Sequence, residues 1–527
     1  MALATRELID AALAAELIDP AGLEEALAQA RRQGADPLEI VAARGRFPAA
    51  AFYRAFAERR GLPFLDLERT PPSTELARKL PETLVRRQRL VPVEGDSGQV
   101  FIATANPDDR STFEAVGRIL RRSVTPALAD PAQLGAAIDA ALAEGGGPPA
   151  VGDDAVALLD RVLHEAYLRR ASDIHLDPQA SGLRIRFRVD GRLADYRRGL
   201  SAALRGALVG RVKVLAGLDI AESRAPQDGG FSQRLGGPDG ADIDIRVATA
   251  PTRWGERATL RLLGSQTKDL TLEALGMEQT DLARFREAIR RPHGMVLLTG
   301  PTGSGKTTTL YAAIREILKP ELNILTVEDP IEYLIDGVGQ VQVGASEKVS
   351  FASALRSLLR HDPDVLMVGE IRDRETADVA LKAAMTGHLV LSTLHASSAC
   401  GAVTRLADIG CEPYLVGATL SAVVAQRLVR RLCRRCSRQT EGGQEGTGCA
   451  ACLGTGFRGR IGLFETLWLD AELGLLVAEG ANEEALRRAA GPRLTTLADD
   501  GWRKVEAGLT TAGEVRRAVW SEGGPGR

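Results

Sequence analysis

Long hydrophobic runs are missing from this chain of 527 residues. No stretch of about 18 uncharged apolar residues occurs, so we expect no transmembrane helix. The first residues carry acidic side chains throughout and lack a long apolar core, which does not fit a secretory signal peptide. These absences predict a cytoplasmic protein, whose attachment to a membrane would require a partner or an amphipathic surface.

An excess of charge of one sign is also missing. Lys and Arg total 67 and Asp and Glu total 69, so the charge of the whole chain does not indicate a nucleic-acid binder. The hydrophobic content of 44% is that of an ordinary globular protein and allows large cores. At this length we expect about three domains.

Cysteine is scarce, but its placement is informative. Of six cysteines, four form two C-x-x-C pairs, Cys433 with Cys436 and Cys449 with Cys452. In a cytosolic chain this spacing favours a metal over disulfides, and four thiolates can close a tetrahedral structural Zn²⁺ site. The polar loop between the pairs has no core of its own, so a metal would help it hold its shape. The alternative is a degenerate loop with unmetallated thiols.

The two remaining cysteines, Cys400 and Cys411, stand alone in the sequence. An isolated cysteine in an apolar stretch most often packs as a small hydrophobic residue. We therefore expect both thiols to be buried and inert.

A glycine- and proline-rich run makes 144–153 the best candidate for a linker. Residues 1–143 before it form an N-terminal region. Its pattern predicts helices over 1–65 and a mixture of strands and helices over 66–143.

The segment 154–265 predicts a small α/β domain. Arg184, Arg186 and Arg188 alternate with apolar residues, so they share one face of an expected strand. A solvated face explains these arginines as well as a binding role does.

From about residue 270 to residue 527, short apolar runs alternate with helical patterns. Strands buried on both faces read as continuous apolar runs, so this region predicts a parallel sheet covered by helices. The expected strands lie at 295–298, 324–327, 365–368 and 389–391.

A phosphate-binding segment follows the first of these strands. Residues 300–307 match the P-loop pattern in full, and an expected helix comes next. Glycines let backbone N–H groups curl around phosphate oxygens, and the helix N-terminus adds positive potential. We expect Lys306 to reach the β- and γ-phosphates of a nucleotide and Thr307 to ligate Mg²⁺. The predicted binding residues are Gly300, Pro301, Thr302, Gly303, Ser304, Gly305, Lys306, Thr307 and Thr308.

Acidic residues follow two of the other expected strands. Glu328, Asp329 and Glu332 come at or after the end of the strand at 324–327, and Glu370 follows the strand at 365–368. In open α/β sheets, ligands bind at the carboxyl ends of the strands, so these carboxylates can converge on the nucleotide. Acidic side chains of solvent-facing loops are the alternative.

At this point the chain resembles the secretion-superfamily ATPases, and within them the type II secretion and type IV pilus assembly branch. The motifs that carry the resemblance are the P-loop at 300–307, an aspartate box at 326–332, a Walker B segment at 364–370 and a histidine box at 386–395. The segments 170–175 and 253–257 add to it. The resemblance covers 155–527 strongly and 1–140 weakly.

The resemblance implies an architecture for the whole chain. It implies a RecA-like ATPase domain with a central parallel sheet over 270–527. A small PAS-like α/β domain at 154–265 would precede it, after an N-terminal α/β docking region at 1–143. The four cysteines would form a zinc-ribbon insertion at 430–460.

The resemblance also implies roles for acidic and histidine residues. The acidic positions are Glu328, Asp329, Glu332 and Glu370. Glu332 resembles the glutamate that activates the attacking water, and Glu370 resembles the Walker B acid that supports Mg²⁺ and water. His388 and His395 resemble sensors that link the γ-phosphate to domain motion, although a single histidine is usually structural.

Arginines are the remaining implied site residues. Arg246 and Arg261 match middle-domain positions that reach the nucleotide. Arg356 and Arg360 share one helix face and match residues that approach a nucleotide from a neighbouring subunit. Surface charge is the alternative for each of them. The family commonly carries an arginine where this chain has Gly230, which puts one phosphate or intersubunit contact in doubt.

Some relatives bind cyclic di-GMP through repeated Arg-Leu-Gly motifs in the N-terminal region. Here the nearest match is Arg32-Gln33-Gly34, and the other copy, Glu7-Leu8-Ile9, has lost both the arginine and the glycine. We therefore do not expect this chain to bind cyclic di-GMP.

The resemblance implies a cytoplasmic hexamer that hydrolyses ATP to ADP and phosphate and powers assembly of a pseudopilus or a type IV pilus. ATP, Mg²⁺ and Zn²⁺ would be its ligands. Residues 1–143 would bind the cytoplasmic part of an inner-membrane platform protein and attach the ATPase peripherally to that membrane. Retraction motors usually lack the four-cysteine insertion and the long N-terminal region, so retraction is disfavoured.

A basic run surrounds the cysteines and comprises Arg427, Arg430, Arg431, Arg434, Arg435 and Arg438. It could be solvated, touch acidic phospholipid or dock a partner. It has no interleaved aromatic residues, so we expect no nucleic-acid partner. The functions that remain as alternatives are a DNA-uptake pilus motor, a non-enzymatic scaffold with a nucleotide-dependent shape, and a zinc-ribbon nucleic-acid translocase.

Overall fold

The computed structural model describes residues 5–33, 36–45, 47–67, 69–95, 98–142, 155–200, 202–235, 241–263, 271–344, 349–440 and 443–520. The predicted linker at 144–153 lies outside the described residues. The chain divides into two compact units. The first comprises Met1–Gln266 with Cys433–Cys436 and Thr447–Gly456, and the second comprises Thr267–Leu432, Ser437–Gly446 and Phe457–Arg527. None of the helices within the described ranges combines the length and apolarity that a membrane span requires.

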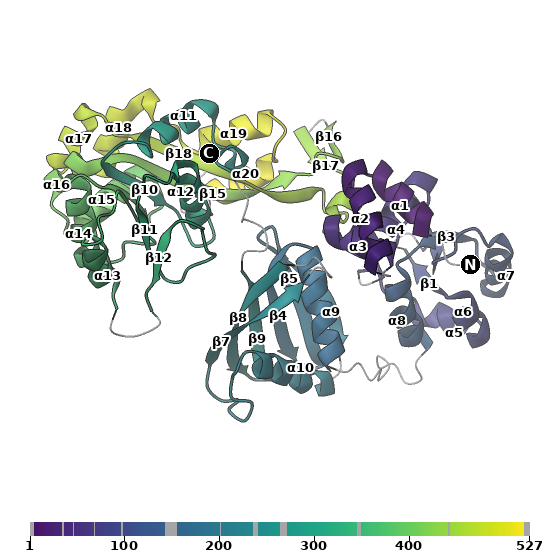
Figure 1. The fold of residues 1–527 in the computed structure, drawn as a ribbon. Helices are drawn as coiled ribbons and strands as arrows, with labels where there is room; N and C mark the ends of the chain where they lie inside the picture. The colour runs from purple at the N-terminus through teal and green to yellow at the C-terminus, as the bar shows by residue number, and fades with distance from the viewer. Residues whose placement is uncertain are drawn as a thin grey trace. The chain divides into compact units, whose positions relative to one another are not determined.

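The first unit begins with a helical part. Its helices are α1 (Thr5–Ala14), α2 (Pro20–Gln33), α3 (Pro37–Gly45) and α4 (Ala49–Arg60) (Figure 1). Their apolar faces share a buried core to which Leu8, Ile40 and Phe52 contribute. Helix α4 ends at Gly61, whose φ of 65° places it in the left-handed conformation that glycine adopts without strain.

A small α/β part follows. Its elements are α5 (Thr74–Arg78), α6 (Glu82–Gln88), β1 (Leu90–Glu94), β2 (Val100–Thr104), α7 (Arg110–Leu120), β3 (Val124–Leu128) and α8 (Pro131–Leu142). The strands lie in the order β1-β2-β3, with β1 antiparallel and β3 parallel to β2. Asp109 caps α7 by accepting a hydrogen bond from the Thr112 N–H at 3.2 Å.

The middle part of the first unit is a six-stranded sheet of order β6-β5-β4-β9-β8-β7, in which every neighbouring pair is antiparallel. Its strands are β4 (Ala171–Gln179), β5 (Gly182–Val189), β6 (Arg192–Leu200), β7 (Gln227–Leu235), β8 (Ala241–Thr252) and β9 (Gly255–Leu262). Helices α9 (Ala155–Leu168) and α10 (Ala202–Leu215) pack on one sheet face and share its core (Figure 1). The opposite face carries the charged residues of the alternating strands.

The second unit is built on a seven-stranded sheet of order β12-β11-β13-β14-β10-β15-β18. The strands are β10 (Gly294–Thr299), β11 (Ile324–Glu328), β12 (Gly339–Gln342), β13 (Val365–Val368), β14 (Leu389–Leu394), β15 (Leu420–Leu432) and β18 (Phe457–Trp468). All neighbouring pairs are parallel except β15 with β18. This confirms the predicted α/β class with a central parallel sheet.

Both faces of this sheet are buried. Along β10, Met295 and Leu297 enter one core and Val296 and Leu298 enter the other. The covering elements are η1 (Glu273–Leu275), α11 (Gln279–Ala288), α12 (Lys306–Ile317), α13 (Phe351–Leu358), α14 (Arg374–Met385), α15 (Ala399–Asp408) and α16 (Pro413–Thr419). The chain ends in α17 (Ala471–Ala478), α18 (Glu483–Ala490), η3 (Gly491–Arg493), α19 (Leu497–Glu506) and α20 (Ala512–Trp520).

The predicted cysteine insertion lies between β15 and β18 in the chain. It contains a hairpin of β16 (Ser437–Thr440) and β17 (Gly443–Gly446), followed by the short turn η2 (Ala450–Cys452). The hairpin belongs to the second unit, whereas all four cysteines belong to the first. We call the two cysteine-bearing segments, Cys433–Cys436 and Thr447–Gly456, the cysteine knuckle.

Candidate functional site

The P-loop connects the end of β10 to the start of α12. Three of its glycines, Gly300, Gly303 and Gly305, have φ values of 142°, 79° and 91°. A Cβ atom on Gly305 would also lie 2.8 Å from Gln426 Nε2. These positions therefore require glycine, and the loop can turn its N–H groups toward one centre.

Lys306 begins α12 and is almost completely buried. Its Nζ donates hydrogen bonds to the carbonyl oxygens of Gly300 at 2.8 Å and Pro301 at 3.2 Å. Burial lowers the pKa of this ammonium group, the Glu370 carboxylate raises it, and the Arg427 guanidinium lowers it again. The lysine is thus held at the loop with a carboxylate and a second cation close by.

Two features of the loop fit a bound triphosphate. Ser304 Oγ is buried and has no hydrogen-bond partner among the described residues. A phosphate oxygen would supply the missing partner, because buried hydroxyl groups are normally hydrogen-bonded. Thr307 and Thr308 follow in the first turn of α12 and are half-buried, so they line the same edge of the sheet.

The carboxyl edge of the sheet brings a second group of predicted residues together. Glu370 follows β13, and its side chain is 14% exposed. It forms an ion pair with Arg372, and one of its oxygens lies 3.5 Å from His395 Nε2. Lys306, Glu370 and His395 therefore lie at the same carboxyl edge of the sheet, where the Glu370 carboxylate also raises the pKa of Lys306.

Glu332 lies on the loop after β11, and a side chain of α12 holds its backbone by a hydrogen bond. Its N–H donates to Tyr311 Oη at 3.3 Å. Tyr311 is fully buried in α12 and donates its own hydroxyl to Glu328 Oε2. Burial and this bond to Glu328 raise the pKa of Tyr311 well above its usual range. The loop that carries Glu332 is therefore tied to the helix that carries Lys306.

The two acidic neighbours of Glu332 occupy different environments. Glu328 is buried, and its Oε1 accepts hydrogen bonds from Thr326 Oγ1 at 2.6 Å and Gln340 Nε2 at 3.0 Å. Asp329 is exposed and lies against Gly344. The Glu328 carboxylate is thus occupied by side chains of its own domain, while Asp329 is open to the edge of the sheet.

The two histidines of the histidine box lie at opposite ends of β14. Seven residue steps of about 3.3 Å separate them by roughly 20 Å. His395 is at the carboxyl end beside Glu370. His388 is at the amino end, where its ring Nδ1 lies 3.0 Å from the Ala383 carbonyl and its own carbonyl accepts from the Gly294 N–H. Within one chain, only His395 lies at the P-loop edge.

Arg356 and Arg360 are exposed at the end of α13. Arg356 pairs with Glu375 at 2.7 Å, and Arg360 donates to the Arg356 carbonyl at 3.2 Å. Both guanidinium groups therefore lie on the surface of the second unit, where another molecule can reach them.

Arg246 and Arg261 belong to the first unit and lie directly opposite each other on β8 and β9. Arg261 Nε donates to Asp173 Oδ1 at 3.0 Å. Gly230 is the direct partner of Arg246 on β7, so the position at which the family commonly has arginine adjoins the other two arginines. A Cβ there would lie 3.0 Å from the Ile245 carbonyl oxygen, which is a tight fit.

Sequence reasoning missed several residues beside the P-loop. Gln426 on β15 accepts from Thr309 Oγ1 at 2.8 Å. Arg427 is buried and donates to the Ser397 carbonyl at 3.0 Å. Of the basic run whose role the sequence leaves open, Arg427 is thus neither solvated nor placed to touch a lipid or a partner, because it is buried in the carboxyl half of β15. Only the sheet order, which no local pattern reveals, places β15 next to β10.

The four cysteine sulfur atoms lie within 4.8 Å of one another. Cys433 Sγ is 3.7 Å from Cys449 Sγ, and Cys436 Sγ is 3.7 Å from Cys452 Sγ. A Zn²⁺ ion with Zn–S bonds of about 2.3 Å sets its four sulfur atoms about 3.8 Å apart. The Cys452 sulfur also accepts from the N–H groups of Cys449 and Gly456. The donor set therefore fits a tetrahedral zinc ion.

The two isolated cysteines are buried, as expected. Burial raises the pKa of the Cys400 and Cys411 thiols to about 11. Both thiols therefore remain protonated at neutral pH.

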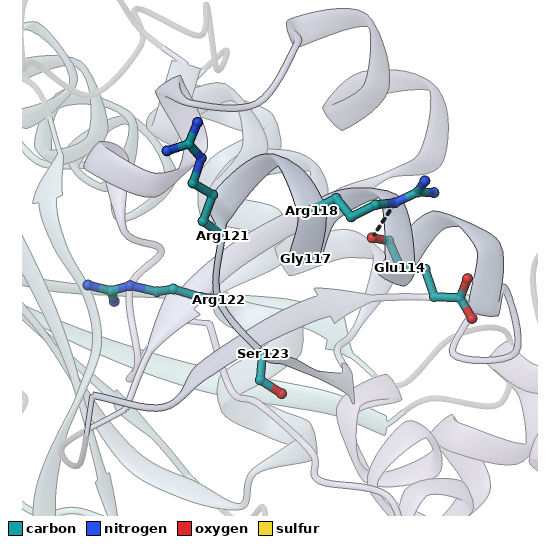
Figure 2. A pocket seen from close by; sticks show the side chains of 6 residues that line it. All are labelled: Glu114, Gly117, Arg118, Arg121, Arg122 and Ser123. Carbon is teal, nitrogen blue, oxygen red and sulfur yellow. Dashed lines mark hydrogen bonds between the residues drawn. The ribbon is translucent and has the colours of Figure 1, made fainter.

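A shallow hollow of about 650 Å³ opens at the end of α7. It is lined by Glu114, Gly117, Arg118, Arg121, Arg122 and Ser123 (Figure 2). Its arginines point in different directions in Figure 2, and one of them, Arg122, pairs with Glu94 at 2.8 Å. The hollow therefore lacks the converging donors of an anion site.

Comparison with known proteins shows two matching families. The family described as "Type II/IV secretion system protein" matches residues 152–517, and the "MshEN domain" family matches residues 60–148.

Curated relatives match over most of the chain. The type II secretion system protein E of Pseudomonas aeruginosa is 42% identical over 519 residues, which are 92% of this chain and 99% of that protein. The type II secretion system ATPase E of Vibrio cholerae is 48% identical over 386 residues, or 70% of this chain and 76% of the relative. Among solved structures, the Legionella pneumophila ATPase DotB is similar with a TM-score of 0.55 and 26% identity, over 68% of this chain and 94% of that one.

Proposed function

Because this chain belongs to the Type II/IV secretion system protein family, we propose that it is a hexameric motor that hydrolyses ATP to power assembly of a pseudopilus or a type IV pilus. Its relatives named type II secretion system ATPase E and protein E support the secretion role in particular. The observation that carries the proposal is the meeting of Lys306, Glu370 and His395 at the carboxyl edge of the sheet.

In the proposed mechanism, the P-loop N–H groups and Lys306 hold the β- and γ-phosphates of ATP. A phosphate oxygen completes the hydrogen bonding of Ser304 Oγ. Thr307 and Glu370 would hold Mg²⁺, which would supply charge neutralisation of the phosphate oxygens. Asp329 lies exposed at the same edge and is the other carboxylate beside the nucleotide. Glu328 does not reach the nucleotide and instead positions the Glu332 loop through Tyr311.

Glu332 orients the water that attacks the γ-phosphate. Catalysis of phosphoryl transfer is mostly positioning and charge stabilisation, so the fixed backbone of Glu332 matters as much as its carboxylate. His395 contacts Glu370 directly and senses whether the γ-phosphate is present through this pair. His388, at the amino end of β14, is the second sensor and links the nucleotide state to domain motion.

Arginines complete the site across a subunit boundary. Arg246 and Arg261 of the middle domain reach the nucleotide, and the exposed Arg356 and Arg360 approach the nucleotide of the next subunit. A head-to-tail interface of this kind closes into a ring. ATP binding then draws the domains together, and hydrolysis lets them part. With Gly230 in place of the usual arginine, Arg246 takes the larger share of the charge stabilisation.

The N-terminal residues 1–143 dock a cytoplasmic domain of an inner-membrane platform protein, so the motor is cytoplasmic and peripherally attached. The match of residues 60–148 to the MshEN domain family supports a separate recognition role for this region. Four thiolates of the cysteine knuckle bind structural Zn²⁺.

Mg²⁺-dependent ATP hydrolysis in fractions separated by size tests the proposal. We expect activity to travel with a large oligomer and to be lost in Lys306→Ala and Glu332→Gln. The exposed residues Lys319 and Glu321 provide matched controls, since Lys319→Ala and Glu321→Gln remove the same charges outside the site. A wild type that stays inert in every fraction, even with acidic phospholipid and a candidate docking domain, would favour the scaffold alternative.

A further inference from the structure

We propose that the cysteine knuckle is the docking surface for the N-terminal helices α1–α4 of the same chain, and that the metal keeps this surface formed. The partner that it fits is a helical bundle that offers a carboxylate and a free helix-end carbonyl. Three sets of contacts within the first unit carry this inference.

The first set is apolar. One buried core contains Leu8 of α1 and Phe52 and Phe56 of α4 together with Ala450 and the knuckle cysteines. The four cysteines are only 2–6% exposed. Cysteine behaves as a small hydrophobic residue in such a place, so the knuckle contributes its own metal-binding centre to the core of the N-terminal helices.

The second set is polar and comes from α4 and α1. Glu58 Oε1 accepts a hydrogen bond from the Ala450 N–H at 2.9 Å. This N–H lies at the start of the turn η2, where backbone donors have no partner within the turn. Arg435, between the first two cysteines, donates to the Ala15 carbonyl next to the end of α1 and lies 3.8 Å from Glu58. A cation is favourable at the carboxyl end of a helix.

The third contact lies between Gly454 of the knuckle and Arg54 of α4. Gly454 has a φ of 78°, and a Cβ on it would lie 2.3 Å from the Arg54 guanidinium. Arg54 also lies 5.4 Å above the Phe64 ring, which limits how far it can move away. The positive φ favours glycine at this position, and the Arg54 side chain of α4 lies in contact with it.

The docking surface depends on the metal for its shape. Its polar contacts come from both halves of the knuckle, Arg435 from one and Ala450 from the other. Few backbone bonds join the halves, such as Cys433 N–H to the Gly456 carbonyl at 3.0 Å and Thr447 N–H to the Cys436 carbonyl at 3.1 Å. Thiolates bound to one ion would fix the halves relative to each other, as in other small metal modules.

Hydrogen exchange on the full-length protein tests this inference, with zinc content measured in parallel. Zinc chelation should make the amides of α1 and α4 exchange roughly tenfold faster, because their charge-assisted contacts are lost. The amides of β10 should stay protected, which shows that the second unit remains folded. Unchanged exchange in α1 and α4 of the metal-free protein would overturn the inference.

A double variant separates docking from metal binding. Glu58→Ala with Arg435→Ala should accelerate exchange in α1 and α4 while one zinc ion per chain is retained. Arg434→Ala is the matched control, because Arg434 is an exposed neighbour in the same loop. If the double variant protects α1 and α4 as well as the wild type does, the knuckle is not their docking surface.

Discussion

Tyr311 is the residue that joins two parts of the site. Its hydroxyl donates to the buried Glu328 and accepts from the Glu332 N–H. Gln340 supports the same group, since its Nε2 donates to Glu328 and its Oε1 accepts from the Ile335 N–H at 2.8 Å. One phenolic oxygen therefore links the backbone of Glu332 to the buried carboxylate of Glu328.

We predict that Tyr311→Phe lowers kcat for ATP hydrolysis by about tenfold and leaves KM for ATP nearly unchanged. The variant keeps the ring in its core but removes the phenolic oxygen that bonds Glu328 and the Glu332 N–H, and such a bond to a charged group is worth about 1.5–3 kcal/mol. Steady-state kinetics measure the two constants. Tyr414→Phe is the control, because Tyr414 is 56% exposed. A rise in KM alone would contradict the positioning role.

His175 is a second residue whose environment has a measurable consequence. Its Nδ1 accepts from Arg257 at 3.1 Å, and its Nε2 is buried without a hydrogen-bond partner among the described residues. Burial lowers the pKa of His175 below its usual 6.5, and Arg257 lowers it further, against the opposing charges of Asp177 and Asp173. The folded state therefore binds this proton less readily than the unfolded state does.

A lowered histidine pKa means that stability is lost as the pH falls below about 6.5. We predict that, between about pH 7.5 and about pH 5.5, the middle domain loses more stability in the wild type than in His175→Gln. Glutamine can still accept from Arg257 but does not titrate. The difference is measured as the shift in denaturant midpoint, with hydrogen exchange of the β4 amides as the signal for the middle domain. The exposed His361→Gln variant should behave like the wild type, and equal losses in wild type and His175→Gln would refute the prediction.

At the scale of elements, one buried ion pair fastens α10 to the sheet. Lys213 is 1% exposed and lies 2.5 Å from Glu256, at the start of β9. Its Nζ also donates to the carbonyls of Asp219 at 3.3 Å and Glu222 at 2.7 Å, which closes the loop after α10. The helix, the loop and the strand thus share one cation.

We predict that Lys213→Met destabilises the middle domain by about 3–5 kcal/mol, because Glu256 would be left as a buried, unpaired charge. The double variant Lys213→Met with Glu256→Gln should be less destabilised, since it removes both charges. Denaturant unfolding measures the free energy of unfolding of both variants, with hydrogen exchange of the β8 and β9 amides as the signal for the middle domain. A double variant that is less stable than the single one would argue against this account.

Local patterns predicted the strands of the second unit well. The apolar runs at 295–298, 324–327, 365–368 and 389–391 correspond to β10, β11, β13 and β14. They were recognisable because a strand buried on both faces is apolar throughout. Strand β12 was not predicted, because the segment Gly339–Gln342 is short and polar and lies at an edge of the sheet. The hairpin of β16 and β17 was not predicted either, because the segment has no apolar alternation.

Some residues of the site could likewise be predicted from local sequence, and others could not. The glycines of the P-loop and the acids after the strands were identifiable because their chemistry requires those residue types at that spacing. Tyr311 and Arg427 were not, because their roles depend on which strands become neighbours in the sheet. Confirmation of the family supports the resemblance that suggested the other roles, yet the reach of Arg246 and Arg356 to a nucleotide stays a prediction.

At the scale of the whole molecule, a ring makes a specific prediction about mixtures. If Arg356 serves the nucleotide of a neighbouring subunit, a mixture of the inactive variants Lys306→Ala and Arg356→Ala will contain intact sites. A subunit that keeps Lys306 then stands beside one that keeps Arg356. Random assembly at equal amounts gives roughly a quarter of the sites in this state.

ATP hydrolysis after co-assembly measures this recovery. The control is a mixture of Lys306→Ala with Glu332→Gln, in which both lost groups belong to the same subunit's half of the site and no recovery is expected. Recovery in neither mixture would show that Arg356 acts within its own chain.

The cysteine knuckle leaves the second unit at Leu432 and returns at Phe457, and these two residues face each other in the register of β15 and β18. Arg430 lies 3.9 Å above the Phe457 ring at the same place. A load applied to the knuckle would therefore enter both strands together, at paired residues at one end of the β15–β18 ladder. One of these two strands, β15, carries Gln426 and Arg427 beside the P-loop. Mechanical tension on the knuckle therefore has a covalent route to the phosphate site.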